Sequence, residues 1–279
     1  MPVFNSAPFL SQAIESILTQ SYKNFELIII DDASTDTSKK IISQFVKNNK
    51  RVRFVKNKIN LGVSLSTNIG ISQAKGQLIA KMDSDDIALP YRLEKQVKFL
   101  QNHPKCVAVG GQCIVIDEEN NVIGNKVFPT IASKTKDMIF WAVPIQQPSI
   151  MIRTNLLPKD FSWYSKSKSS TEDVDLMFRL LNFGQLKNLS QNVLLYRHRS
   201  NSLSHTNPKL TFRLTLQSRL NAIKNGYRPS LKAIILNIAQ VITISLLPNS
   251  LINQLWSILR GINKVNALNT TISYLPSLN

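Results

Sequence analysis

Apolar and polar positions follow two regular patterns over residues 1–110 of the chain. Nearly unbroken apolar runs predict strands buried on both faces, and apolar residues at helical spacing predict helices between them. The strands are expected at 25–30, 51–55 and 77–82, and the helices at 8–21, 34–48, 65–74 and 90–99. This alternation predicts an α/β fold with a mostly parallel central sheet flanked by helices.

The pattern changes in the second half of the chain. Strands are expected at 106–109 and 112–117, joined across Gly110 and Gly111, followed by a helix at 171–183 and a strand at 193–196. Beyond residue 208 the periodicity is helical only. We therefore expect an α/β domain over residues 1–205 and a basic, amphipathic helical extension over residues 206–279.

Charge is distributed unevenly between these two parts. The chain carries 34 Lys+Arg and 17 Asp+Glu, a formal net charge of +17, yet every acid lies at or before Asp175. From Leu176 onward there are 12 Lys and Arg and no acid. An anionic partner is therefore expected there, either nucleic acid or an anionic membrane surface. Aromatic residues are too sparse in the basic part to favour nucleic acid, so none is expected.

Composition removes several classes of protein. An apolar fraction of 43% excludes a mainly disordered chain, and two Cys exclude a disulfide framework. The sequence has neither of the common Gly-rich phosphate loops and no hydrolase-type Ser elbow. The three His are not spaced as zinc ligands are, so the sequence favours neither a zinc site nor a catalytic triad.

The acids themselves fall into three clusters, which hold nine of the 17. They are Asp31, Asp32 and Asp36; Asp83, Asp85 and Asp86; and Glu172, Asp173 and Asp175. The first two clusters directly follow predicted strands, and ligands of open α/β sheets bind at the carboxyl ends of strands. Mg²⁺ takes one or two carboxylates together with substrate phosphates, and the third cluster could supply a general base. The alternative is that each cluster only caps helices and shapes turns.

An ordered series of motifs resembles family 2 glycosyltransferases of the GT-A fold, from Pro2 to about Ser204. The series is Pro2-Val3-Phe4-Asn5, residues 13–22, Phe25–Asp36, Asn60-Leu61-Gly62 with residues 68–76, Met82–Asp86, Leu89-Pro90, Arg92-Leu93-Glu94, Glu172–Leu176 and Tyr196-Arg197. The Gln-x-x-Arg-Trp motif of processive synthases is absent from the sequence. The resemblance therefore implies non-processive, inverting transfer of one sugar, of the bacterial type.

The resemblance also implies roles for individual residues. The donor would be a nucleotide-diphosphosugar, with Phe4 stacked on the base, Asp32 hydrogen-bonded to it, and Asp31 and Pro2 beside it. Asp83 and Asp85 form the D-x-D motif that contacts the donor and binds Mg²⁺ or Mn²⁺. Asp173 would be the catalytic base, and Arg197 could contact the diphosphate, as could Arg199.

Three departures from the family pattern lead to further expectations. The strand that normally precedes Pro2 is expected to be missing, so the first strand would be truncated and the native start would lie upstream, or the gene would be damaged. Ala33 stands where the family prefers Gly, which predicts an ordinary φ. Gln147 occupies a place where relatives often carry His.

The C-terminal extension carries two apolar stripes. They comprise Leu231, Ile234, Ile235, Ile238, Val241 and Ile242, and then Leu251, Leu255, Ile258, Leu259 and Ile262, with Trp256 nearby. Either both pack on the catalytic domain, or residues 206–279 lie in the plane of a membrane. Membrane attachment predicts a cytoplasmic protein, peripheral on the inner face of the cytoplasmic membrane. It would suit a saccharide or lipid-linked saccharide acceptor in cell-surface polysaccharide or glycolipid synthesis.

Two rival functions remain open at this point. A nucleotidyltransferase shares the α/β architecture and the paired carboxylates, but it would release pyrophosphate rather than a nucleoside diphosphate. A catalytically impaired relative that lacks its first strand is the other.

Overall fold

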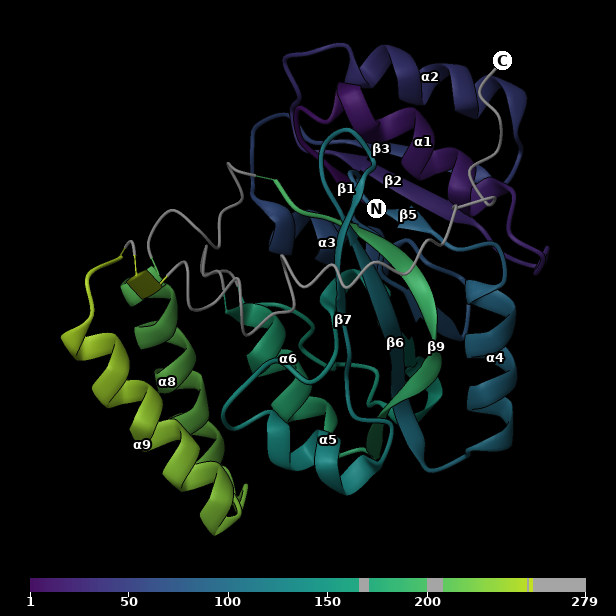
Figure 1. Ribbon diagram of the computed structural model, residues 1–279. Coiled ribbons are helices and arrows are strands. Elements are labelled where there is room, and N and C mark those ends of the chain that lie inside the picture. Colours follow the sequence, from purple (N-terminus) through teal and green to yellow (C-terminus); the bar gives the residue numbers. More distant parts are fainter. Residues whose placement is uncertain (166–170, 200–207, 250, 253–279) are drawn as a thin grey trace.

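The computed structural model describes residues 1–165, 171–199, 208–249 and 251–252 (Figure 1). It has two sheets with helices around them, and a pair of helices at one side of the molecule. The first sheet has the order β1 (Pro2–Val3), β2 (Leu27–Asp31) and β3 (Val52–Lys56), and all its pairs are parallel. The α/β fold expected from the alternation of strands and helices is thus present.

The helices that connect the first sheet follow the predicted spacing closely. They are α1 (Ala7–Leu18), α2 (Ser38–Asn48) and α3 (Val63–Ser72). Leu10, Ala13, Ile14 and Ile17 form the buried face of α1, because they recur at helical spacing. Every residue of β2 is buried, as expected for a strand that neighbours cover on both faces.

The second sheet has the order β4-β8-β6-β9-β5, with β7 paired to β6. Its strands are β4 (Leu78–Ala80), β5 (Ile87–Ala88), β6 (Cys106–Ile116), β7 (Val122–Lys126), β8 (Met151–Arg153) and β9 (Gln185–Arg197). Only β6 and β9 are parallel here, and the other pairs are antiparallel. The expectation of one mostly parallel sheet is corrected in this respect. The parallel order requires helical crossovers, and these are regular only over the first sheet.

Most of the remaining helices lie around the second sheet, and the last two form the pair at one side of the molecule (Figure 1). They are α4 (Arg92–Asn102), α5 (Ala132–Met138), the short 3-10 helices η1 (Gln147–Ser149) and η2 (Thr154–Leu156), α6 (Glu172–Leu180), α8 (Pro208–Lys224) and α9 (Leu231–Leu246). Beyond residue 208 the described chain is helical, as the periodicity predicts. No helix among the described residues is both long and apolar enough to cross a membrane.

The two glycines of β6 do not form the predicted junction between two strands. β6 runs unbroken through Gly110 and Gly111 for 11 residues. A Cβ at Gly110 would lie 2.4 Å from Asn188 Oδ1, and one at Gly111 would lie 2.6 Å from Val193 Cγ2. These positions therefore need glycine because other side chains pack directly against the backbone, and not because the chain turns.

The first strand, expected to be truncated, consists of the two residues of β1. Pro2 pairs with Ile30 and Val3 with Asp31, and Asp32 N donates to Val3 O at 2.8 Å. β1 thereby covers the edge of β2 next to the candidate site. The strand is short, as expected, but it is paired, so β2 lies between two strands.

Packing at the boundary between the two predicted parts is close. Ala222 of α8 and Ala233 of α9 are buried in the same apolar cluster as Val174 and Leu180 of α6. The rings of Phe178 and Tyr227 meet edge to face with their centroids 4.9 Å apart. One side of the helix pair therefore packs on the catalytic part. Of the second predicted stripe, only Leu251 lies within the described residues.

Candidate active site

Two loops that follow neighbouring strands are joined by polar contacts. Asn5, after β1, has φ +48° and accepts the backbone N–H of Thr35, after β2, at 2.9 Å. Asp36 accepts the backbone N–H of Ala7, at the first residue of α1, at 3.0 Å. Phe4 projects from this joined region and is 48% exposed. An exposed aromatic ring on a fixed loop is suited to stacking on a planar ligand.

The turn after β2 differs from expectation at Ala33. This residue has φ +62°, so the prediction of an ordinary φ is wrong. Asp31 Oδ1 accepts the N–H of Ser34 at 3.0 Å and thereby holds the turn closed. The turn keeps the left-handed conformation that glycine adopts readily, and alanine adopts it at a cost in strain.

Asp31 and Asp32 both lie at the end of β2, where the sequence places them, and both are buried. Asp32 Oδ1 accepts the side-chain amide of Asn57 at 2.8 Å and the N–H of Leu61 at 2.9 Å. Asp32 Oδ2 accepts the N–H of Gly62 at 2.8 Å. Asp32 therefore fixes the loop between β3 and α3. Its predicted contact with a base, like those of Asp31, Phe4 and the buried Pro2, stays a prediction.

The D-x-D loop follows β4 and contacts the loop that carries Phe4. The hydroxyls of Ser84 and Ser6 are 2.7 Å apart, and both side chains are buried. Asp86 Oδ1 accepts the backbone N–H of Arg197 at 2.7 Å. Burial, then Asp85 and Asp83, raise the pKa of Asp86 well above its ordinary range. Asp86 thus holds the loop against β9, while Asp83 and Asp85 project from it.

Arg197 lies at the end of β9 and is committed to protein partners, in contrast to the expectation that it contacts the donor. Its side chain is 3% exposed. The guanidinium donates to the carbonyls of Asp85 and Asp117, both at 2.7 Å, and to the Asn120 side chain at 2.8 Å. Burial of an arginine requires such partners, and here they leave no free fork for a phosphate. Arg197 therefore positions the D-x-D loop.

Arg199 is the cation paired with Asp85 of the D-x-D motif. Its Nη1 lies 3.4 Å from Asp85 Oδ2, and it is partly exposed. Burial is the largest cause that raises the pKa of Asp85, and the neighbouring Asp83 raises it further. A positive charge is therefore needed to keep Asp85 ionised, and Arg199 partly meets this need because it lowers the pKa of Asp85.

Asp173 lies in the first turn of α6. It is far from the D-x-D motif in the sequence, but the charge of Asp83 acts on its carboxyl group. Burial is the main cause that raises the pKa of Asp173 to about 6. Lys81 opposes this shift, Asp83 adds to it, and a hydrogen bond from Gln147 opposes it. Asp83 of the second acidic cluster and Asp173 of the third therefore interact electrostatically. A carboxylate with a pKa near neutrality is suited to general-base chemistry.

Three residues that surround Asp173 had no role in the sequence prediction, or only a marginal one. Lys81 Nζ lies 3.4 Å from Asp83 Oδ1 and 5.9 Å from the centre of the Tyr164 ring. Gln147, from η1, donates to the Tyr164 hydroxyl at 3.4 Å. Burial, then Asp173, raise the pKa of Tyr164 well above its ordinary range. Lys81 and Tyr164 therefore share one buried environment with Asp173.

Lys81 could have been found from the sequence. It is a lysine in the apolar run 77–82, directly before the D-x-D motif, and its side chain is only 7% exposed. Arg92, the first residue of α4, is also buried and donates to the Lys81 carbonyl at 2.6 Å. A buried cation within an apolar strand end points to a nearby anion. Tyr164 lies in an irregular segment, and nothing in its surroundings in the sequence indicated a role.

The donor set at this site fits a hard divalent cation. Asp83 and Asp85 offer two carboxylates whose mutual repulsion a divalent cation relieves. Mg²⁺ and Mn²⁺ accept such oxygens and share the rest of their coordination with phosphate groups. Among the residues that the structure describes, no group of three or more His, Cys, Asp or Glu is arranged to hold a metal alone. The set therefore fits a cation that arrives together with a diphosphate.

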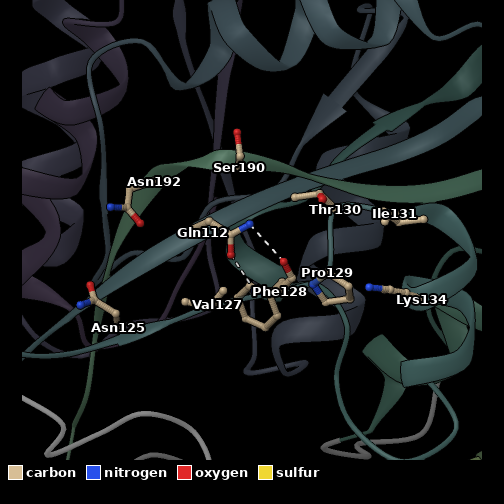
Figure 2. Close-up of a pocket in the computed structure, with 10 residues that line it drawn as sticks. All are labelled: Gln112, Asn125, Val127, Phe128, Pro129, Thr130, Ile131, Lys134, Ser190 and Asn192. Carbon is tan, nitrogen blue, oxygen red and sulfur yellow. Dashed lines mark hydrogen bonds between the residues drawn. The ribbon is translucent and has the colours of Figure 1, made fainter.

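A hollow on the surface is lined by residues other than these carboxylates. Its volume is about 540 Å³, and β6, β7, β9 and the start of α5 contribute to it (Figure 2). Gln112, at its base, donates to Phe128 O at 3.2 Å and accepts the N–H of Phe128 at 2.6 Å. Lys134 is the single charged residue among the described residues that line it. None of the described residues that line this hollow is an acid, so it offers no carboxylate to a metal ion or as a general base.

Comparisons with known proteins agree with this geometry. The model of the family "Glycosyl transferase family 2" matches residues 1–158. The putative glycosyltransferase EpsE of Bacillus subtilis is 35% identical over 204 residues, which cover 72% of each chain.

Two solved structures share the fold at low sequence identity. S. aureus TarS in complex with UDP-GlcNAc has a TM-score of 0.65 at 19% identity, over 85% of this chain and 68% of that one. The mannosyltransferase PcManGT of Pyrobaculum calidifontis, in complex with GDP-Man and Mn²⁺, has a TM-score of 0.59 at 15% identity, over 93% of this chain and 82% of that one. The fold class predicted from the sequence, the GT-A fold, is confirmed, and the chain belongs to glycosyl transferase family 2.

Proposed function

We propose that this protein transfers one sugar from a nucleotide-diphosphosugar to an acceptor hydroxyl, with inversion at the anomeric carbon. The observation that carries the proposal is Asp173, a partly exposed carboxylate whose pKa is raised to about 6 by desolvation and which interacts electrostatically with Asp83 of the D-x-D loop. A single displacement at the anomeric carbon requires a base for the acceptor hydroxyl and groups that stabilise the leaving diphosphate, and both would lie in this one site.

In the proposed reaction, Asp173 takes the proton of the acceptor hydroxyl as its oxygen attacks the anomeric carbon. The new C–O bond forms as the bond from that carbon to the diphosphate breaks, and the nucleoside diphosphate leaves with the bonding electrons. Gln147 orients the Asp173 carboxylate through its hydrogen bond. Lys81 keeps the pKa of Asp173 from rising further, so that the base is ionised near neutral pH.

The donor would lie across the joined loops after β1, β2 and β4. Phe4 would stack on the base, with Asp31, Asp32 and Pro2 beside it, and Asp83 would contact the sugar diphosphate. Complexes of the structural neighbours with UDP-GlcNAc and GDP-Man support a donor of this class. Arg199, rather than Arg197, would contact the diphosphate. The Arg197 guanidinium already donates hydrogen bonds to the carbonyls of Asp85 and Asp117, whereas Arg199 is partly exposed beside Asp85.

Asp83 and Asp85 would hold Mg²⁺ or Mn²⁺, which supplies charge neutralisation for the leaving diphosphate. The Mn²⁺ in the PcManGT complex supports this assignment. The acceptor would be a saccharide or lipid-linked saccharide in cell-surface polysaccharide or glycolipid synthesis. The protein would act on the inner face of the cytoplasmic membrane, which residues 206–279 would contact.

The reaction class is tested by the products formed from a panel of UDP- and GDP-sugars with Mn²⁺. Free nucleoside diphosphate, formed with water or an added saccharide as acceptor, is the expected product. Pyrophosphate would instead indicate a nucleotidyltransferase, and no turnover of any bound donor would indicate an impaired relative. The anomeric configuration of the product, read by NMR, must be opposite to that of the donor.

A further inference from the structure

Helix α9 directs two polar side chains inward and a row of large apolar side chains outward. Its buried residues include Asn237, whose side-chain amide donates to Phe140 O at 3.1 Å. Gln240, on the same side, donates to Trp141 O at 2.6 Å and accepts Arg219 Nη1 at 3.1 Å. A surface helix of a globular protein normally has the opposite arrangement.

The outward side of α9 carries five large apolar residues that form one stripe. They are Leu231, Ile235, Ile238, Ile242 and Leu246, and each is more than half exposed. At about 100° per residue, their spacing places them on one side and Ala233, Asn237, Gln240 and Ile244 on the other. We call these five residues the outer stripe. It lies along the outermost helix on that side of the molecule (Figure 1).

The surroundings of the outer stripe are basic. Lys232 is exposed at the start of α9, and Lys224 and Arg228 are exposed at the connection from α8. The exposed residues of α8 include Lys209 and Arg213 with Leu210 and Leu220. The sequence from 176 to 279 has no acid, so no carboxylate of this part opposes an anionic surface.

These features together identify the partner by its chemistry. An apolar stripe without charge, next to exposed lysines and arginines, complements the acyl chains and phosphates of an anionic lipid surface. A second protein chain would cover the stripe equally well, but it would not require that residues 176–279 carry 12 Lys and Arg and no acid. We infer that the outer stripe of α9 is the surface by which this protein lies in the interface of an anionic membrane. This rests on and narrows the membrane contact proposed for residues 206–279.

The orientation follows from the packing of α9. The side with Asn237 and Gln240 binds the backbone carbonyls of Phe140 and Trp141, which follow α5. α5 and α6 belong to the part that carries Asp173, so the helix pair ties the catalytic part to the membrane at a fixed side. A lipid-linked acceptor would thereby be held within reach of the same surface.

The experiment measures co-sedimentation of the full chain with phosphatidylglycerol–phosphatidylcholine vesicles and with pure phosphatidylcholine vesicles. Binding is expected to the anionic vesicles, and to weaken in high salt. The double variant Ile238→Gln/Ile242→Gln should lower the partition coefficient by roughly tenfold or more, because two apolar side chains no longer leave water. Lys224→Gln/Lys232→Gln should reduce binding mainly at low salt.

Val46→Gln is the matched control, because Val46 is an exposed apolar residue on a different helix, α2. Its vesicle binding should equal that of the wild type. Thermal shifts with UDP- and GDP-sugars, measured without vesicles, should be the same for all these variants. These thermal-shift measurements distinguish a loss of membrane binding from a loss of the proposed donor binding.

Three results would overturn the inference. The first is the absence of binding to anionic vesicles, and the second is binding that the outer-stripe variant retains at wild-type strength. The third is a dimer in analytical ultracentrifugation that the same variant dissociates while vesicles bind neither form. A thermal unfolding curve unchanged by Ile238→Gln/Ile242→Gln excludes misfolding as the cause of lost binding.

Discussion

Lys81 and Asp83 lie two residues apart on one loop, and the Lys81 ammonium is 3.4 Å from the Asp83 carboxylate. The two residues have opposite effects on Asp173, because Lys81 lowers the pKa of that carboxyl and Asp83 raises it. Burial raises the pKa of the proposed base most, and the charges of the D-x-D loop adjust that pKa further. Any change in the charge of this loop should appear in the pH dependence of the reaction.

Replacing Lys81 with Met should raise the pKa of Asp173, because a positive charge that favours the carboxylate is removed. The acid limb of the pH–rate profile should then move to higher pH. Donor turnover near pH 6 should fall by roughly tenfold or less, and turnover near pH 8 should fall much less. The measurement is kcat/KM for nucleoside diphosphate release from pH 5 to 9.

Lys98→Met serves as the control, since Lys98 is an exposed lysine on α4. Its profile should overlay that of the wild type. If the acid limb of Lys81→Met stays in place while kcat falls equally at every pH, Lys81 does not act through Asp173.

Removal of divalent metal should abolish turnover and weaken donor binding. Asp85→Asn should have a similar effect, a loss of roughly 100-fold or more, since Asp85 is one of the two carboxylates proposed to hold the cation. Isothermal titration of Mn²⁺ in the presence of a nucleoside diphosphate measures the affinity directly. Asp160→Asn, which alters an exposed acid elsewhere, should leave the affinity unchanged. Full turnover in EDTA would contradict a metal role.

Ala33→Gly should stabilise the protein, because Ala33 holds φ +62°. Relief of left-handed strain, offset by the greater freedom of glycine when unfolded, leaves a gain of about 0.5–1 kcal/mol. Denaturant unfolding with an unchanged m-value measures this gain. Ala239→Gly, within α9, should change stability in the opposite direction by about 1 kcal/mol. A destabilised Ala33→Gly would mean that the turn does not strain alanine.

Much of the fold could be predicted from hydrophobic periodicity. The strand at 27–31 and helix α1 agree closely with their patterns, because neighbours cover both faces of the strand and one face of the helix. β7 and β8 were missed, since five- and three-residue strands of mixed polarity carry no clear alternation. β6 was divided in two because glycine usually marks a turn, whereas here it allows Asn188 and Val193 to approach the backbone.

The acidic part of the site was predictable for a different reason. Asp83 and Asp173 occupy motif positions, and the structure brings their environments together. The function of Arg197 was not predictable, since the motif does not reveal that Asp117 and Asn120 occupy its guanidinium. The outward apolar side of α9 is visible as a stripe in the sequence. Which side of the helix packs inward depends on the hydrogen bonds of Asn237 and Gln240.

Asp173→Asn tests the central claim through both thermal stability and turnover, and the effect on stability comes first. Burial raises the pKa of Asp173 to about 6, above its value in an unfolded chain. The carboxyl therefore contributes its stability at low pH, and that contribution is lost as the pH rises through about 6. The amide does not ionise, so the variant should unfold at a higher temperature than the wild type at pH 8, by a few degrees, and the difference should shrink at pH 5.

The most direct test is the release of nucleoside diphosphate by wild-type protein and Asp173→Asn, at donor concentrations matched to their measured affinities. The proposed base role predicts wild-type turnover that falls below about pH 6 and a variant slowed by roughly 100-fold or more, with donor binding unchanged. An Asp173→Asn protein that turns over donor at close to the wild-type rate, with the same pH profile, would contradict the account.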